Sequence, residues 1–524
     1  MMKKQKMLAG AGVLAAAGLI AKILSAVYRV PFQNIVGNQG FYVYQQVYPL
    51  YGIGMVLALT GWPLFISKVI AEQETIQAQR VIAQRLLVLL SVVGVILFTG
   101  LYFGAEYIAQ GMSDIRLTAE IQAVAWLFLL IPFLAVGRGY TQGQLDMLPT
   151  AFSQVIEQVI RVSWILLIAW YGIQADWSVY RIGTWATFAA TLAGVGAMAY
   201  LVFHMKPKLL ISRTVQANPQ LSWKRLAYRL WTEGSLLALL AALLIFLQLV
   251  DSFMVKRLLE VIGYTSTQAE YTKGVYDRGQ PIVQLGMVVA TGIGTALLPN
   301  LRVHWLNQKE SLVRRNFRLT VRLSLVFSIM AVVGLVAIMP ALNTMLFASA
   351  EGSGTLSWYV LMILPASLLT VLSSVLQSIN QAQGLTWYVG VTIILKVVAN
   401  SFLIRLMGID GAALSSVVAL LPFLLFVIIK TPKSFFKTGF SGKWFYNVGL
   451  VAAGVFISAF LITWLCGLVF GWTRLGSMLT VVVAVLVGLL TFLFMAVKLR
   501  IFTEDEWLAL PKGAWLKQKI DRGA

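Results

Sequence analysis

Residues Gly54-Met-Val-Leu-Ala-Leu-Thr-Gly61 recur, one residue shorter, as Gly286-Met-Val-Val-Ala-Thr-Gly292. A second pattern repeats in the same order further along each half. Pro132, Gln142-Gly143-Gln144, Glu157 and Arg161 correspond to Pro365, Gln381-Ala382-Gln383-Gly384, Lys396 and Asn400. Two short matches in consistent order predict an internal repeat, with the second apolar span of one half equivalent to the second of the other.

The composition places these repeats in a membrane. The 524 residues are 59% hydrophobic and 12% charged, with a mean hydropathy of +0.82. Soluble domains carry about 45–50% apolar and about 25% charged residues. A single cysteine, Cys466, excludes an intrachain disulfide, and two distant histidines argue against a metal site. We therefore expect a multi-pass membrane protein without a metal centre.

Fourteen stretches are apolar and long enough to cross a hydrocarbon core of about 30 Å as helices. They lie near 8–28, 41–67, 82–104, 117–137, 151–173, 182–204, 232–255, 272–298, 319–346, 357–379, 387–407, 411–430, 446–470 and 476–497. With the repeat, they predict an all-α fold of two six-helix lobes plus two C-terminal helices. Because six is even, the lobes would be related by a pseudo-two-fold axis along the membrane normal. The expected domains are 1–204, a basic cytoplasmic linker 205–231, 232–430, and 431–524.

Loop charge sets the expected orientation. With both termini in the cytoplasm, 29 of the 41 Lys and Arg residues fall in cytoplasmic loops or tails, 8 outside and 4 within spans. This asymmetry follows the positive-inside rule. It accounts for most of the net charge of +21 without nucleic acid as a partner. The sequence thus predicts a protein of the cytoplasmic membrane.

Four cations lie where a charge is costly, in or beside the first, second and eighth spans: Lys22, Arg29, Lys68 and Arg278. If these spans line a cleft between the lobes, the cations form an unbalanced site that a compact polyanion such as a pyrophosphate would complete. An alternative is that Arg29 and Lys68 extend to the interfaces, and that Asp277 neutralises Arg278.

Other buried charges have structural or coupling interpretations. Glu157 and Arg161 are four residues apart on one predicted helix, which favours a self-neutralising pair. Asp251 and Lys396 have no local partner. They either pair across the second lobe, or Asp251 binds a proton or cation.

Enzymatic motifs are missing from this sequence. There is no GxxxxGK[ST] phosphate loop, no dinucleotide fingerprint with all three glycines and no HExxH. No soluble stretch is long enough for a catalytic domain. We therefore expect a transporter rather than an enzyme, with no cofactor.

Several motifs resemble known transporters. Tyr44-Gln-Gln-Val-Tyr-Pro49 and Arg138-Gly-Tyr-Thr-Gln142-Gly-Gln-Leu-Asp-Met-Leu-Pro149 resemble polysaccharide-transport proteins of the SpoVB/YtgP type. Tyr276-Asp277-Arg278, followed by Gly294-Thr-Ala-Leu-Leu-Pro299, resembles the MurJ lipid II flippases. Both belong to the multidrug/oligosaccharidyl-lipid/polysaccharide exporter superfamily. The likeness covers nearly the whole chain.

This resemblance implies translocation of lipid II, the lipid-linked peptidoglycan precursor, or of a related undecaprenyl-pyrophosphate glycolipid in a bacterial cytoplasmic membrane. It maps substrate-binding cations onto Lys22, Arg29, Lys68 and Arg278. It also implies a role in cell-wall biogenesis and cell shape, with wall-synthesis enzymes as possible partners. The polyprenyl tail would follow a groove beside the two C-terminal helices.

The resemblance also raises the question of coupling. Some relatives have a sodium site that Asp251 and Asn400 would match, but Lys396 lies one turn before Asn400. We expect Lys396 to take the place of the cation, and the membrane potential to supply the energy. Three alternatives stay open: a flippase for another polysaccharide or teichoic unit, a drug/cation antiporter, and a non-transporting scaffold.

Overall fold

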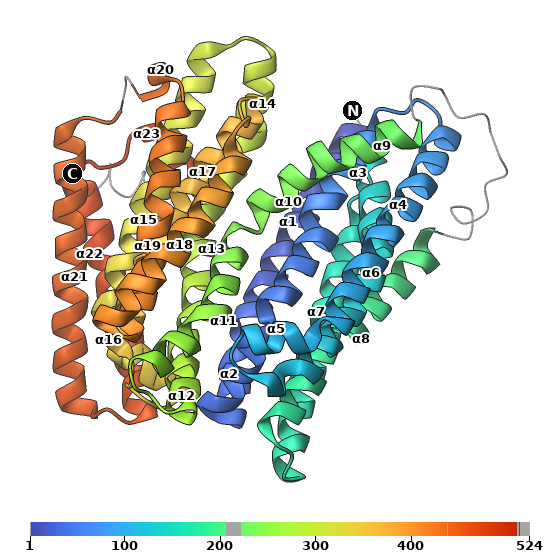
Figure 1. Cartoon of the computed structure of the whole chain (residues 1–524). Coiled ribbons are helices and arrows are strands. Elements are labelled where there is room, and N and C mark those ends of the chain that lie inside the picture. Colours follow the sequence, from blue (N-terminus) through green and yellow to red (C-terminus); the bar gives the residue numbers. More distant parts are fainter. Residues whose placement is uncertain (1, 206–221, 437–438, 511–512, 514–524) are drawn as a thin grey trace. The chain divides into compact units, whose positions relative to one another are not determined.

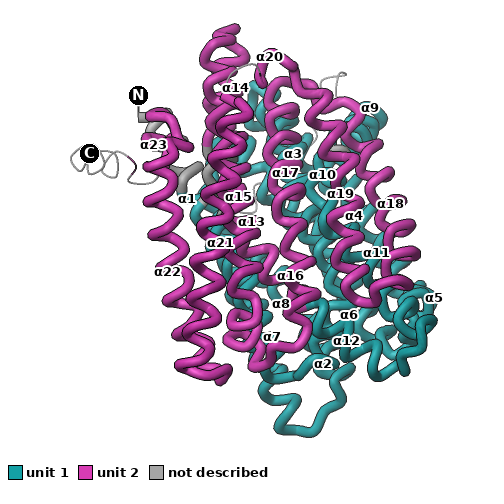
Figure 2. The backbone as a smooth tube through the Cα atoms, turned by 90° about the vertical axis from the view of Figure 1, so that its left-hand side faces the viewer, with its two compact units in different colours: residues 1–277 teal, residues 278–524 magenta. Residues whose placement is uncertain are grey.

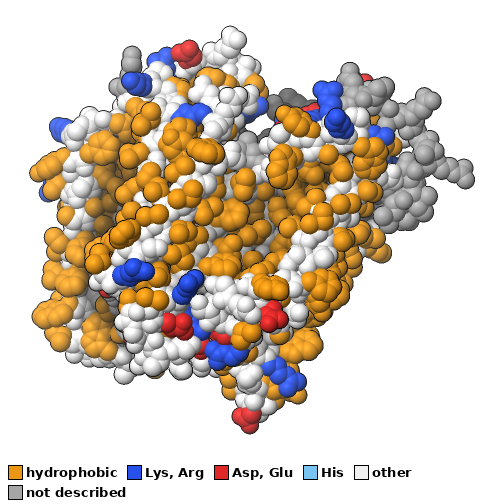
Figure 3. Space-filling model, viewed as in Figure 1, with side chains coloured by type: hydrophobic (Ala, Val, Ile, Leu, Met, Phe, Trp, Pro, Cys, Tyr) orange, Lys and Arg blue, Asp and Glu red, His pale blue; other side chains and the backbone are white. Residues whose placement is uncertain are grey.

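The computed structural model describes residues 2–205, 222–436, 439–510 and 513, and every regular element in them is a helix (Figure 1). The chain divides into two compact units, an N-terminal unit of residues 1–277 and a C-terminal unit of residues 278–524 (Figure 2). On both units, hydrophobic side chains cover most of the helix surface seen in Figure 3. Such an apolar exterior is what a lipid environment requires.

The helices of the N-terminal unit alternate between long spans and short connectors. They are α1 (Met2–Val27), α2 (Arg29–Val56), the π-turn η1 (Leu57–Gly61), α3 (Trp62–Ala71), α4 (Ile76–Phe103), α5 (Ala105–Gly111), the 3₁₀ turn η2 (Ile115–Leu117), α6 (Thr118–Gly143), α7 (Leu148–Gln174), α8 (Val179–Met205), α9 (Trp223–Arg229), the π-turn η5 (Leu230–Gly234), α10 (Ser235–Ala241), α11 (Leu243–Val261) and α12 (Ser266–Asp277).

The C-terminal unit continues in the same way. Its helices are α13 (Gly279–Ala296), α14 (Leu298–Leu306), α15 (Glu310–Phe347), α16 (Ser353–Val360), α17 (Ile363–Ser378), α18 (Leu385–Met407), α19 (Ile409–Lys430), α20 (Lys433–Phe436), α21 (Gly442–Phe470), α22 (Arg474–Lys498) and α23 (Glu504–Ala509).

All fourteen predicted spans are covered by helix. Eleven helical segments of the described residues are long and apolar enough to cross a membrane, and a pair bent by 67°, Trp223–Ala241 with Leu243–Val261, gives up to twelve. One of the eleven, Ala16–Ala71, begins within the first predicted span and contains the second, and α12 with α13 covers most of the eighth. The predicted all-α membrane fold is confirmed.

Two glycines break the apolar runs where the sequence predicts loops. Gly37, with φ of 72°, separates the first span from the second inside α2, and Gly408, with φ of +58°, separates α18 from α19. Positive φ costs a glycine little because it has no Cβ. The glycines at these two positions therefore allow the chain to turn between consecutive spans within a few residues.

The repeated motif has the same packing role in each unit. A Cβ on Gly54 would lie 3.1 Å from the Ile131 side chain of α6, and a Cβ on Gly286 would lie 2.5 Å from the Ile363 side chain of α17. Both isoleucines come just before the repeated prolines of these helices. In each unit, therefore, the second span of the half packs closely against the fourth.

The compact units do not follow the predicted domain boundaries. α9 to α12, expected in a lobe 232–430 and its linker, cluster with the N-terminal unit. Most of the predicted linker 205–231 lies outside the described residues. The lobe boundaries derived from the repeat, and the cytoplasmic location of the termini, stay predictions.

Candidate functional site: a buried arginine–tyrosine cluster

Arg29 is a fully buried cation in the N-terminal unit. It starts α2, and its side chain is 0% exposed. The guanidinium lies 4.1 Å from the ring centroid of Tyr48. None of its three nitrogens has a hydrogen-bond partner among the described residues. A buried charge without hydrogen bonds costs several kcal/mol, so this arginine is poised to receive an acceptor.

Arg161 of α7 lies against the same tyrosine-rich segment. Its guanidinium is 4.6 Å from the Tyr51 ring and 5.1 Å from the Tyr28 ring. Nη2 donates to Gln158 Oε1 at 2.8 Å and to Ser25 Oγ at 3.1 Å, whereas Nε and Nη1 are buried without a partner. We call Arg29, Arg161, Tyr28, Tyr44, Tyr48 and Tyr51 the arginine–tyrosine cluster.

The predicted pair of Glu157 and Arg161 is wrong. Glu157 Oε2 instead accepts from Arg138 Nη2 at 2.5 Å. Arg138, also 0% exposed, further donates to Ser153 Oγ and to the carbonyl oxygen of Ala58. Because α6 brings Arg138 to Glu157, the carboxylate leaves Arg161 one helical turn away with two free nitrogens.

Lys22 and Lys68 differ from Arg29 in their surroundings. Lys22 is exposed and makes no hydrogen bond or ion pair with another described residue. Lys68 forms an ion pair of 2.5 Å with Glu233, with 60% of its side chain exposed. Arg229 completes this surface cluster by binding both Glu233 and Glu72. In the structure, Lys68 thus belongs to an exposed ion-pair cluster and not to the arginine–tyrosine cluster.

Asp277 and Asp251 lie on α12 and α11 of the N-terminal unit. Asp277 forms an ion pair of 2.5 Å with Lys273 and also interacts electrostatically with Arg29, without a hydrogen bond to it. Asp251 accepts a hydrogen bond of 2.7 Å from the Tyr276 hydroxyl. Both predicted acids are therefore engaged by neighbours in their own unit.

Arg278 starts the C-terminal unit and is 1% exposed. It donates to Asn343 Oδ1 at 3.2 Å, and its guanidinium lies 5.2 Å from the Phe347 ring. These contacts hold the buried side chain near the end of α15.

Lys396 is completely buried between α18 and α19. Its ammonium donates to Ser415 Oγ at 2.8 Å, to Ser416 Oγ at 2.7 Å and to the carbonyl oxygen of Ala412 at 3.2 Å. Asn400 accepts from the same Ser415 hydroxyl at 2.6 Å. Oxygen ligands around a buried cation are the arrangement expected if the ammonium occupies the place of a metal ion.

The chain is similar to known proteins over nearly its whole length. The family model described as "Polysaccharide biosynthesis protein" matches residues 7–303. The uncharacterized membrane protein YabM of Bacillus subtilis is 34% identical over 98% of this chain and 96% of its own length. This chain belongs to the polysaccharide biosynthesis protein family.

Two further relatives of this chain carry a functional name. The lipid II flippase MurJ of Bacillus subtilis is 25% identical over 94% of this chain and 95% of its own length. A solved structure of a lipid II flippase MurJ in an inward closed conformation superposes with a TM-score of 0.69 at 12% identity. It covers 93% of this chain and 99% of its own. The structural match confirms the predicted exporter fold of this family member, a multi-pass protein of a bacterial membrane.

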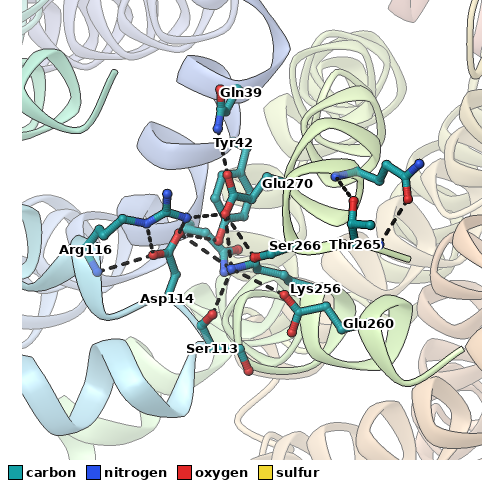
Figure 4. A network of polar contacts seen from close by, with 12 residues as sticks. Gln39, Tyr42, Ser113, Asp114, Arg116, Lys256, Glu260, Thr265, Ser266 and Glu270 are labelled. Carbon is teal, nitrogen blue, oxygen red and sulfur yellow. Dashed lines mark hydrogen bonds and ion pairs between the residues drawn. The ribbon is translucent and has the colours of Figure 1, made fainter. Parts of the chain in front are cut away.

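In this member of the polysaccharide biosynthesis protein family, an ion network also exists that the sequence analysis missed (Figure 4). Lys256 is 2% exposed and lies 3.3 Å from Glu270, 3.6 Å from Glu260 and 3.7 Å from Asp114. Arg116 pairs with both Asp114 and Glu270. The network joins η2 to α11 and α12 across about 140 residues of sequence, so no local spacing reveals it.

The network predicts a specific acid dependence. Burial alone would raise the pKa of Asp114, but hydrogen bonds from Arg116 and Tyr180 and the charge of Lys256 together lower it. An acid with a depressed folded pKa contributes stability above its unfolded pKa, about 3.9, that is lost as pH falls through the folded value. We expect Asp114→Asn to be less stable than wild type at pH 7. The difference in melting temperature should shrink below about pH 4, and a difference independent of pH would contradict this.

Proposed function

We propose that this chain is a flippase for a lipid-linked glycan precursor, most specifically lipid II, which it carries from the inner to the outer leaflet by alternating access. The observation that carries the proposal is the set of buried arginines, Arg29, Arg161 and Arg278. Two of them, Arg29 and Arg161, have side-chain nitrogens without a hydrogen-bond partner among the described residues. Guanidinium groups are the usual partners of phosphate oxygens. Membership of a family with flippase relatives supports the same conclusion.

In this mechanism, the head-group pyrophosphate is the anion that completes the buried cations. In the N-terminal unit, Lys22 attracts it and Arg29 binds it, and Arg278 is the cation that the C-terminal unit offers to it. An inside-negative potential, worth about 2.3 kcal/mol per charge per 100 mV, favours outward movement of the anion and inward return of the empty cations. Lys396 supplies a fixed charge, so transport would not require sodium. The membrane potential would then favour both the export step and the return of the empty transporter.

The drug/cation antiporter alternative needs an acid free to bind the cargo. Glu157 is bound to Arg138, Asp251 to Tyr276, and Asp277 to Lys273. Each of these acids therefore has a bound partner, although Asp277 Oδ2 itself has none, whereas Arg29 has no hydrogen-bond partner among the described residues at any of its three nitrogens. The balance of free groups favours an anionic cargo.

We assign part of the polyprenyl tail to an apolar groove in the C-terminal unit. It has a volume of about 280 Å³ and runs between α15, α21 and α22, where its lining includes Ile338, Ala459 and Phe492. Only hydrocarbon of the substrate would be stable there. This is the pair of C-terminal helices that the sequence predicted to hold the tail.

The groove makes a prediction about substrate length. A Cβ on Gly488 would approach Ala459 and Val455 only to 3.8 and 3.9 Å, so Gly488→Leu should fold while filling the groove. We expect transport of a long-chain polyprenyl substrate to fall several-fold and that of a short-chain analogue to change little. Gly449→Leu, at an exposed glycine of α21 with open space around it, is the control. Equal transport of both substrates by Gly488→Leu would remove the groove from the mechanism.

Complementation tests the function itself. The chain is expressed in a bacterium depleted of its own lipid II flippase, with protein abundance checked by immunoblot. Rescue by wild type, lost in an equally abundant Arg278→Ala, supports lipid II as substrate. Failure of abundant wild type would favour another undecaprenyl-linked glycan or a teichoic unit. Rescue by both would leave the flippase standing and refute the role of Arg278. Loss of rescue on neutralising a buried arginine would also argue against the non-transporting scaffold.

A further inference from the structure

Arg161 stands out among the buried cations because neither its helix nor its spacing suggested a binding role. It is 1% exposed, and two of its nitrogens have no acceptor. A purely structural arginine in this place would be expected to satisfy its donors, as Arg138 does with Glu157, Ser153 and Ala58.

Arg29 and Arg161 face one stripe of tyrosines. Tyr44, Tyr48 and Tyr51 recur at helical spacing on α2, and the ring centroids of Tyr48 and Tyr51 are 5.4 Å apart. Arg29 stacks on the first of these two rings and Arg161 on the second. The guanidiniums of Arg29 on α2 and Arg161 on α7 therefore lie against neighbouring tyrosine rings on one face of α2.

A small cavity lies at this place. It is lined by Tyr44, Tyr48, Tyr51, Arg161, Ala186, Thr187 and Ala190. Its volume is only about 10 Å³, so the site is closed in this structure. Within this lining, Arg161 makes a cation–π contact with Tyr51, and such contacts are worth about 0.5–2 kcal/mol. An oxyanion that forms charge-assisted hydrogen bonds with the guanidiniums can replace such contacts.

We propose that Arg29 and Arg161 together form a two-arginine oxyanion site, and that Arg161 is a second pyrophosphate-binding residue beside Arg29. The tyrosine rings hold both guanidiniums in place while the site is empty. A pyrophosphate has one phosphate for each guanidinium, and each planar group can bind two oxygens. This inference rests on the proposed function, since it names the part of the head group that the N-terminal unit binds.

Binding of inorganic pyrophosphate to the purified full-length protein in nanodiscs, measured by calorimetry, tests the proposal. Arg161→Gln, which keeps hydrogen-bonding capacity without the charge, should weaken binding about tenfold or more. Arg181→Gln is the matched control, because Arg181 also stacks on a ring, that of Trp177, but is exposed and outside the cluster. It should bind as wild type does.

Wild-type affinity in Arg161→Gln, together with loss in Arg29→Gln, would overturn the proposal. If Arg161→Gln fails to fold, the same binding measurement on Arg161→Lys tests the proposal instead. It keeps the charge but not the planar fork, and we expect binding a few-fold weaker; unchanged binding would overturn the proposal. Absence of pyrophosphate binding by wild type would also refute it. If pyrophosphate binding depends on Arg161 but the protein does not transport lipid II, lipid II is rejected as the substrate and the two-arginine site is still supported.

Discussion

Arg29→Gln should abolish most transport without lowering the stability of the protein. The substitution removes a buried guanidinium whose three nitrogens have no hydrogen-bond partner among the described residues. The folded state loses a costly buried charge, together with a stacking contact with Tyr48 and an electrostatic interaction with Asp277. Transport, in contrast, loses charge-assisted hydrogen bonds to the substrate. Hydrogen bonds to charged groups contribute about 1.5–3 kcal/mol, so we expect the rate of flipping to fall at least tenfold. The melting temperature should be unchanged or raised.

Arg138→Gln is the informative comparison. Arg138 is as deeply buried as Arg29 but is paired with Glu157 and bonded at all three nitrogens. Removing one partner of a buried ion pair costs about 3–5 kcal/mol. Arg138→Gln should therefore be strongly destabilised. If Arg29→Gln were destabilised to the same degree, Arg29 would be a structural residue and the anion site would lose its main support.

Lys256→Met should destabilise the N-terminal unit strongly. The substitution leaves Asp114, Glu260 and Glu270 around a half-exposed Arg116, with two of the three carboxylates almost fully buried. Because removing one partner of a buried ion pair leaves the other charge unpaired, the free energy of unfolding should fall by about 3–5 kcal/mol. The measurement is thermal unfolding of the purified protein, with Glu270→Gln added in a double variant that should recover part of the loss.

Lys68→Met supplies the control for Lys256→Met. Lys68 also pairs with a glutamate, Glu233, but its side chain is 60% exposed. Exposed ion pairs contribute about 0–1 kcal/mol, so its melting temperature should barely change. Equal effects of the two lysine variants would show that the network in Figure 4 is no more than a set of surface charges.

Hydropathy was sufficient to predict the helices of this protein. A span needs only a run of apolar residues, and the breaks at Gly37 and Gly408 coincide with residues that tolerate positive φ. The repeat was also readable, because Gly54 and Gly286 lie at equivalent places of close helix packing in the two units.

The partners of the charged side chains were not readable from sequence. The spacing of Glu157 and Arg161 satisfied the local rule for a helix pair, but a third helix placed Arg138 against Glu157. Lys68 and Arg29 were indistinguishable as charges near span ends, yet one is exposed and the other buried. Such choices depend on which helices meet, and that information is tertiary.

The most direct test of the account is transport of lipid II in proteoliposomes. The purified chain is reconstituted with lipid II, and the appearance of its head group on the opposite leaflet is followed with and without an imposed potential of known sign. The account predicts flipping by wild type that is accelerated by a potential favouring movement of the anion and lost in Arg29→Gln. Flipping equally fast in protein-free vesicles, or undiminished in Arg29→Gln, would contradict it.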